Sequence, residues 1–171
     1  YCYYDVEKST DTIHKPWEAA PKRRVKFSSD LGYNYPVTID SVGAYFYVWP
    51  DNPWSTDKFA MRIVAPGYEA LPDTTLWEAL DQTAVSGEFY KIKLPVSIVR
   101  TKGWAVEIEA AGTTTGDPGN LAGPTPDGNI HSFFYNTLNS SYDSYMVTSG
   151  EQPAEYAILS FVESAEEPPV A

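Results

Sequence analysis

Apolar and polar residues alternate with a period of two in several segments of this 171-residue chain. Between 103 and 110, large apolar side chains take every second position, and Glu107 and Glu109 fall on the opposite side. Such alternation is typical of antiparallel strands that pack one face on a core. With clusters of Gly, Pro, Asn and Asp as boundaries, the pattern predicts strands at 23–28, 37–49, 57–65, 88–94, 95–100, 103–110, 130–136, 143–148 and 154–163.

The segment 37–49, VTIDSVGAYFYVW, is the longest and most aromatic of these runs. Its alternation predicts a buried side made of Val37, Ile39, Ala44, Phe46 and Val48. The opposite, exposed side then holds three rings, those of Tyr45, Tyr47 and Trp49. The phase breaks near residues 41–43, where we expect Gly43 to form a β-bulge, because glycine inside a strand often marks one.

Two other segments depart from simple strands. Residues 73–82, DTTLWEALDQ, predict a short helical turn, because Asp73 or Thr74 can cap it and two leucines stand four residues apart. Pro95 interrupts the apolar region 88–100, so we expect two short strands there rather than one.

Together these patterns predict an all-β fold, an antiparallel, jelly-roll-like β-sandwich of about eight or nine strands with one short helical turn. The length is typical of a single domain that covers residues 1–171. We interpret the N-terminal segment 1–22 and the C-terminal tail 164–171 as extensions available for contacts between subunits.

Charge and composition narrow the classes of partner. The formal net charge of −11 argues against nucleic acid, whose phosphates need a basic surface, and against anionic membranes. No apolar run reaches the roughly 20 residues that span a bilayer. The single cysteine, Cys2, excludes an internal disulfide and leaves a free thiol or a pairing between chains. An aromatic content of 15% favours contact surfaces.

Several pieces follow one another in a recognisable order: Tyr3-Tyr4-Asp5, RRVKFSS at 23–29, YPVTIDSVGAYFYVW at 35–49, DKFAMRIVA at 57–65, LPDTTLW at 71–77, EFYKIKLPVSIV at 88–99, GWAVEIEA at 103–110 and HSFFY at 131–135. In this order they resemble the β-sandwich accessory domains of secreted, often multidomain, bacterial proteins. The resemblance implies a jelly-roll-like sandwich with no catalytic role of its own. Val6-Glu7 replaces the Asp-Gly turn that usually follows the Tyr-Asp element. We expect the sandwich to stand alone, without a second domain, and this favours a self-assembling subunit.

Residue types that carry catalysis are scarce. No Gly-x-Ser-x-Gly element accompanies the two histidines, His14 and His131, and Cys2 is poorly placed for a preorganised dyad. Glu107 and Glu109 would lie about 7 Å apart on one strand face, a separation that glycoside hydrolysis tolerates. Any Glu-x-Glu on a strand gives this spacing, so we interpret the pair as a solvated sheet face. We predict no catalytic residue and no enzymatic activity.

Two kinds of ligand site stay open. The loop 111–129 is rich in Gly and Pro, and a loop of this length is usually functional or mobile. Its oxygen-bearing residues suit calcium, although ordinary turn chemistry explains them equally well; the candidate ligands are Asp117, Asp127 and Asn129. We predict no other cofactor. Exposed rings beside polar residues suit carbohydrate, and the candidates are Tyr45, Tyr47, Trp49 and Trp54.

Assembly of the chain with further copies of itself is the function that we favour. A basic cluster stands out in this acidic chain and can meet the acidic C-terminal end of a neighbour, although a solvated face is the simpler alternative. The cluster consists of Lys22, Arg23, Arg24 and Lys26. The Tyr-rich segment 1–6 is a candidate strand donor for β-augmentation, and head-to-tail contacts that do not close give a filament. The candidate interface residues are Tyr1, Tyr3, Tyr4, Lys22, Arg23, Arg24, Glu163, Glu166 and Glu167.

The sequence thus predicts an extracellular or cell-surface structural protein, the subunit of a filament, tube or surface layer. The alternative is a carbohydrate-binding or other ligand-binding module. Concentration-dependent polymerisation favours the first function, and retention on a glycan column favours the second.

Overall fold

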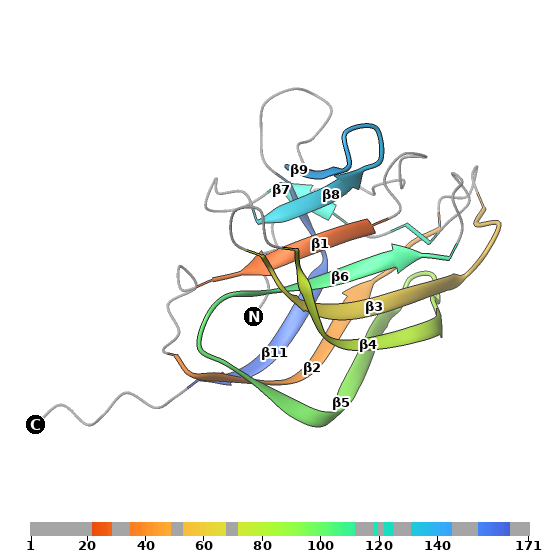
Figure 1. Cartoon of the computed structure of the whole chain (residues 1–171). Coiled ribbons are helices and arrows are strands. Elements are labelled where there is room, and N and C mark those ends of the chain that lie inside the picture. Colours follow the sequence, from red (N-terminus) through yellow and green to blue (C-terminus); the bar gives the residue numbers. More distant parts are fainter. Residues whose placement is uncertain are drawn as a thin grey trace, which may run out of the picture.

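The computed structural model describes residues 22–28, 35–48, 53–67, 72–111, 118–119, 122–124, 131–144 and 154–164, without the side chains of 122–124, 154–156 and 164. Nine strands form two antiparallel sheets that face each other as a β-sandwich (Figure 1). The predicted all-β fold is confirmed.

The larger sheet has six strands in the order β4-β3-β6-β1-β8-β9. Their bounds are β4 (Thr74–Thr83), β3 (Lys58–Ala65), β6 (Trp104–Ala110), β1 (Lys22–Phe27), β8 (Ser132–Asn136) and β9 (Ser141–Ser144). The smaller sheet has the order β11-β2-β5, with β11 (Ile158–Ser164), β2 (Val37–Tyr45) and β5 (Phe89–Arg100). A separate two-stranded ribbon pairs β10 (Ala154–Tyr156) with β7 (Ala122–Pro124).

Aromatic side chains fill the space between the two sheets. Phe27 stacks on Trp104 with ring centroids 5.5 Å apart, and Phe46 of the smaller-sheet side meets Phe59 at 4.6 Å. The Trp104 indole N–H donates to the Ser160 hydroxyl at 3.0 Å, which ties β6 to β11 across the core. Rings of this size bury a large apolar area, so this layer dominates the stability of the sandwich.

A bulge in β2 explains its broken alternation. Val37 and Ile39 are buried before the break, and Val42, Ala44 and Phe46 are buried after it. Both neighbouring strands skip Asp40: Ile39 and Ser41 pair with Ile98 and Lys93 of β5, and with Val162 and Phe161 of β11. One extra residue moves the inward face from odd to even positions. The predicted inward set is confirmed except for Val48, which is half-buried.

The predicted bulge at Gly43 is wrong, because the extra residue is Asp40. Gly43 has a different role. A Cβ at this position would lie 2.5 Å from the Phe89 ring and 2.5 Å from the Tyr90 carbonyl oxygen. The glycine therefore permits a close approach between β2 and β5.

The predicted helical turn at 73–82 is also wrong. The segment forms β4, a ten-residue edge strand of the larger sheet that pairs with β3. Leu76 and Leu80 stand four residues apart, and this spacing puts two residues on one side of a strand as readily as on one face of a helix. Pairing with β3 decides between the two, with irregularities that include Asp81 at a φ of 55°.

Pro95 does not divide its region into two strands, because β5 is continuous from Phe89 to Arg100. Its pairing with β2 is nevertheless interrupted. The register steps from Lys93 to Ile98 while β2 advances from Ser41 to Ile39. Since proline has no N–H for a ladder hydrogen bond, it fits this unpaired stretch of an edge strand.

Candidate functional site

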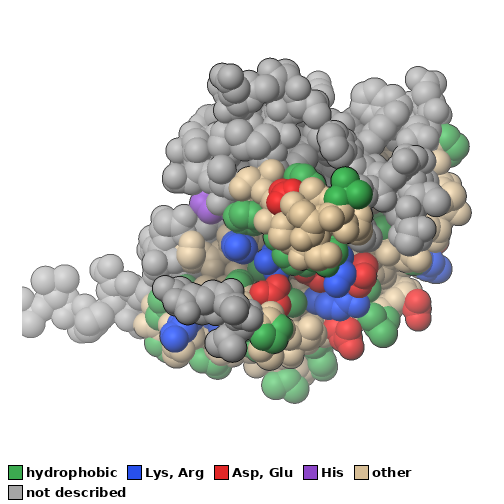
Figure 2. All heavy atoms as spheres, turned by 45° about the horizontal axis from the view of Figure 1, so that its top comes forward, with side chains coloured by type: hydrophobic (Ala, Val, Ile, Leu, Met, Phe, Trp, Pro, Cys, Tyr) green, Lys and Arg blue, Asp and Glu red, His purple; other side chains and the backbone are tan. Residues whose placement is uncertain are grey.

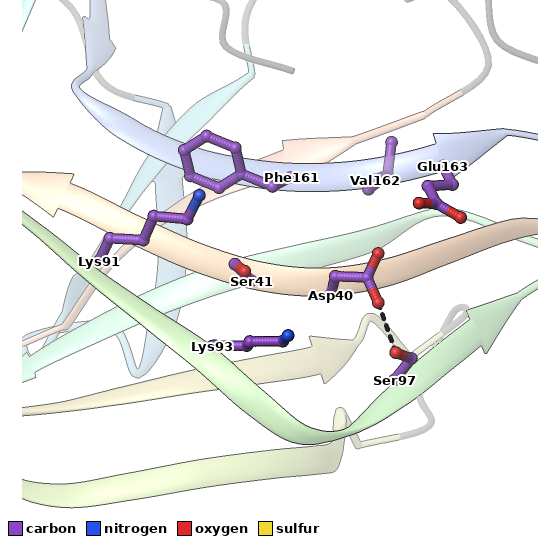
Figure 3. Close-up of a pocket in the computed structure, with 8 residues that line it drawn as sticks. All are labelled: Asp40, Ser41, Lys91, Lys93, Ser97, Phe161, Val162 and Glu163. Carbon is purple, nitrogen blue, oxygen red and sulfur yellow. Dashed lines mark hydrogen bonds between the residues drawn. The ribbon is translucent and has the colours of Figure 1, made fainter.

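The solvent face of the smaller sheet carries an open hollow of about 830 Å³. Figure 3 shows the three strands side by side, with β2 between β11 and β5. Each strand contributes side chains to the lining, which consists of Asp40, Ser41, Lys91, Lys93, Ser97, Phe161, Val162 and Glu163. This volume lies within the range of small-ligand sites.

The double irregularity of β2 and β5 shapes one end of the hollow. Asp40 is the extra residue of β2, and Ser97 belongs to the stretch of β5 that β2 leaves unpaired. The Ser97 hydroxyl donates to the Asp40 carboxylate across this gap (Figure 3). This hydrogen bond holds the carboxylate in place and leaves its second oxygen available as an acceptor.

Aromatic rings support the other end. Phe89 lies over Gly43 and makes an edge contact with Phe161, with ring centroids 6.1 Å apart. The Lys91 ammonium lies 3.8 Å from the centroid of the Phe161 ring, a cation–π contact that Figure 3 shows. The close approach at Gly43 thus positions Phe89, which in turn supports Phe161 and its lysine.

Charges of both signs face this hollow without neutralising one another. Within the described part of the chain, neither the Lys93 ammonium nor the Glu163 carboxylate has a hydrogen-bond or ion-pair partner. In Figure 3, Lys93 extends along the sheet toward the end that holds Asp40. The hollow therefore combines the unpartnered Lys93 ammonium of β5 with the unpartnered Glu163 carboxylate of β11 and the second carboxylate oxygen of Asp40 on β2.

The floor of the hollow restricts how a ligand can bind. β2 is paired with β5 on one side and β11 on the other, so most of its backbone groups are already bonded. A strand-like peptide needs an unpaired sheet edge for backbone recognition. A ligand in this hollow must instead be recognised by side chains.

The outer face of the larger sheet uses its charges differently. A row of alternating sign crosses four adjacent strands, because Arg62 stands opposite both Glu78 and Glu107, and Glu107 stands opposite Arg24. Figure 2 shows acidic and basic side chains side by side on the face turned to the viewer. Opposite charges on directly paired strands stabilise a sheet.

Glu107 is the buried centre of this row. It is 4% exposed, accepts a hydrogen bond from the Tyr142 hydroxyl, and lies 3.7 Å from an Arg62 nitrogen. The interpretation of Glu107 and Glu109 as a solvated sheet face is therefore wrong for Glu107. The sequence alone does not show that Glu107 stands between Arg24 and Arg62, because this depends on the register of β6 with β1 and β3. Arg62 also pairs with Glu109, so both carboxylates are committed to contacts within the chain.

The titration of this cluster reflects its burial. Burial, together with the adjacent Glu107 charge, raises the pKa of the Tyr142 hydroxyl far above its usual value, so it stays a donor. Burial opposes ionisation of Asp73, but the Gly67 N–H and Arg24 hold its pKa below the usual value. Burial and then Arg24 lower the pKa of Lys26. These shifts are those of an internal network of paired groups.

The basic cluster of the sequence lies within this network. Lys22 pairs with Glu109 at 3.8 Å, and Arg24 pairs with Asp73 while its guanidinium stacks 3.3 Å from the Tyr142 ring centroid. Arg23 is 2% exposed and donates to the Pro118 carbonyl at 2.8 Å. The three cations are thus engaged inside the chain, and their part in assembly stays a prediction.

The other predicted interface and ligand residues are only partly within the described chain. Glu163 lines the hollow, and its contact with the basic cluster of a neighbouring copy stays a prediction. Tyr45 and Tyr47 are half-buried, the Tyr45 hydroxyl donates to the Gly87 carbonyl at 2.9 Å, and Trp54 packs against the core. None of these rings lines the hollow. Outside the described residues lie Tyr1, Tyr3, Tyr4, Trp49, Glu166 and Glu167.

The predicted calcium ligands Asp117, Asp127 and Asn129 also lie outside the described residues. Within those residues, no group of three or more His, Cys, Asp or Glu side chains is arranged to hold a metal ion. The same part of the chain contains no helix that is long and apolar enough to cross a membrane.

The sequence indicates only a few of the residues that line the hollow. In EFYKIKL at 88–94, Lys91 and Lys93 alternate with apolar residues and so share the outer face of β5. Asp40 stands at the break in the alternation of β2. No pattern within one strand shows that these residues meet Phe161 and Glu163, because that depends on pairing between distant segments.

Comparisons with known proteins do not indicate a function for this chain. No protein-family model, no curated protein and no solved structure matches the chain. The resemblance to accessory domains is supported at the level of a β-sandwich with two antiparallel sheets.

Proposed function

We propose that this chain is a non-enzymatic carbohydrate-binding module and that the hollow on the smaller sheet is its binding site. One observation carries the proposal: the Lys93 ammonium and the Glu163 carboxylate, neither with a partner among the described residues, face the same open hollow on the smaller sheet. In keeping with the resemblance to secreted accessory domains, we place this function outside the cell.

Sugar hydroxyls match a lining of mixed charge. Each hydroxyl donates one hydrogen bond and accepts others, so it can bond to Glu163 or Asp40 as a donor and to Lys93 as an acceptor. Hydrogen bonds to charged groups are the stronger ones, which suits a ligand bound at an exposed surface. An apolar ligand would leave these charges without partners.

Self-assembly is the second candidate, and one observation favours it. Val96 and Val99 of the edge strand β5 are 75% and 61% exposed, which is apolar surface that a neighbouring copy can cover. The same strand carries Pro95, an interrupted register and two exposed lysines, and these features protect an edge against pairing. The irregular pairing of β4 with β3 likewise protects that edge of the larger sheet against pairing with another chain. We therefore rank assembly below sugar binding.

A glycan array tests the proposal directly. We expect the wild-type chain to retain at least one class of oligosaccharide, and Glu163→Ala to weaken this binding about five- to tenfold through the loss of a charged acceptor. Glu88→Ala is the matched control, because Glu88 is exposed and does not line the hollow. Silence of the wild-type chain across the array, or equal effects of both variants, would contradict the proposal.

Self-assembly has its own readout. Light scattering of the wild-type chain across a concentration series distinguishes a growing polymer from a species of constant mass. If the mass grows with concentration and Val99→Lys abolishes the growth, assembly through β5 becomes the better account.

A further inference from the structure

The distribution of charge within the hollow narrows the class of sugar, on the condition that the proposed carbohydrate binding is correct. We infer that the hollow takes an acidic glycan, whose units carry a carboxylate as in uronic acids. The inference rests on what Lys91, Lys93, Asp40 and Glu163 offer to a ligand.

Phe161 does not present a free aromatic platform on the side that Lys91 covers. The ammonium stands 3.8 Å from the ring centroid, where a neutral sugar would otherwise stack. The negative face of the ring holds the cation at the wall of the hollow. This end of the hollow therefore presents a positive charge, and stacking of a neutral sugar here requires displacement of Lys91.

Lys93 adds a second positive charge on the same strand. Residues two apart on a strand share a face and lie about 7 Å from each other, so Lys91 and Lys93 both project from the outer face of β5. Lys93 has no ion-pair or hydrogen-bond partner within the described chain. A ligand carboxylate placed beside these two lysines would meet its complementary charge.

Asp40 and Glu163 limit how much negative charge a bound ligand can carry. Asp40 already accepts one hydrogen bond from Ser97 and can accept another from a sugar hydroxyl, as can Glu163. A densely sulfated or phosphorylated chain would place charge against these carboxylates and be repelled. A unit with one carboxylate and several hydroxyls satisfies both the basic and the acidic side.

Calorimetric titration with matched oligosaccharides tests this inference. The probes are oligogalacturonate, its carboxyl-reduced neutral counterpart, and a heparin fragment as a densely sulfated control. We expect oligogalacturonate to bind at least tenfold more tightly than both. We also expect its affinity to fall as the salt concentration rises from 50 to about 300 mM, because exposed charge pairs are screened.

Two lysine variants test whether the positive charge that binds the ligand carboxylate lies in the hollow. Lys93→Gln should weaken oligogalacturonate binding at least fivefold and the neutral counterpart far less, because the glutamine amide still donates to a sugar hydroxyl but carries no positive charge. Lys102→Gln, at an exposed lysine outside the hollow, should change neither. Thermal unfolding of each variant confirms that the fold is intact, and the salt series on the wild-type chain tests the inference even if one variant fails to fold.

The outcomes separate the two proposals. If the neutral counterpart binds as tightly as oligogalacturonate, or if heparin binds more tightly, the acidic-sugar inference is wrong while carbohydrate binding stands. If no acidic or neutral oligosaccharide binds here or on the array, both proposals fail.

Discussion

The two outer faces of the sandwich carry similar side chains but use them in opposite ways. On the larger sheet, Glu107 is buried, and Arg24, Arg62 and Tyr142 are bound to carboxylates within the chain. On the smaller sheet, Lys93 and Glu163 face the hollow without partners among the described residues. Paired and buried charge is part of the structure, whereas exposed and unpaired charge is available to a ligand.

Neighbouring elements create this difference. Rings of β8 lie over two cations of β1: the Lys26 ammonium is 4.1 Å from the Phe133 ring centroid, and the Lys22 ammonium is 5.9 Å from that of Tyr135. In the smaller sheet, the irregular pairing at Asp40 and Pro95 opens the surface. Substitutions on the first face should therefore affect stability, and substitutions on the second should affect binding.

The largest expected loss of stability follows the removal of the buried carboxylate. Glu107→Ala leaves the Tyr142 hydroxyl without its acceptor and removes a charge next to Arg62, and should lower the free energy of unfolding by about 3 kcal/mol. Glu107→Gln keeps an acceptor and should cost less. Urea unfolding measures both, and equal stability of Glu107→Ala and the wild type would show that the row is not structural.

Gly43→Ala should follow, with a loss of about 2 kcal/mol. The new methyl group would stand 2.5 Å from both the Phe89 ring and the Tyr90 carbonyl, so β5 must shift away from β2. Unlike Glu107→Ala, this variant should also weaken glycan binding, because Phe89 supports Phe161. Unchanged unfolding and unchanged binding would mean that β5 does not approach β2 this closely.

Tyr142→Phe should cost about 1–2 kcal/mol, since it removes the hydroxyl donor to Glu107 but keeps the ring over Arg24. Glycan binding should not change. A weakened affinity in this variant would place part of the binding site on the larger sheet. Calorimetric titration and urea unfolding on one preparation measure both properties.

Asp73→Asn should have a smaller effect that depends on pH. The pKa of Asp73 lies below its usual value of about 3.9, so its ionised form stabilises the fold above that pH, and this contribution is lost as the pH falls through the folded pKa. The variant should be about 1 kcal/mol less stable than the wild type at pH 7. The gap in urea midpoint should narrow as the pH falls below about 4 and close below the folded pKa of Asp73; a gap that stays constant would contradict the pairing with Arg24.

The smallest effects on stability should come from the hollow. Lys93→Gln and Glu163→Gln should each change the free energy of unfolding by less than about 0.5 kcal/mol, because neither side chain has a partner to lose. Thermal unfolding checks this expectation. A loss above 1 kcal/mol in either variant would show that the hollow, too, is held together by its charges.

Much of the fold is predictable from the sequence, because period-two alternation reports directly on burial. The inward faces of β2 and β6 agree with the structure, including the phase break in β2. The helical turn predicted at 73–82 is wrong for a physical reason. Leucines four residues apart fit one side of a strand and one face of a helix equally well, and only the pairing with β3 decides between them. The break in β2 was visible, but its position depends on which residue the neighbouring strands skip.

Much less of the candidate site than of the fold can be predicted from the sequence. Tyr45 and Trp54 drew attention because rings and Trp are common in sugar sites, whereas the structure engages them with Gly87 and the core. The hollow joins Asp40, Lys93 and Phe161 from three strands. Such convergence is a property of tertiary pairing, so no local pattern contains it.

Mapping of the bound oligosaccharide on the chain by NMR tests the central claim most directly. Titration of the tightest binder from the array into isotope-labelled protein should shift the amide signals of Asp40, Lys93 and Phe161 most strongly. The signals of Arg24, Glu107 and Tyr142 should stay nearly unchanged. Dominant shifts on the larger sheet, or uniform absence of shifts, would contradict a glycan site in the hollow of the smaller sheet.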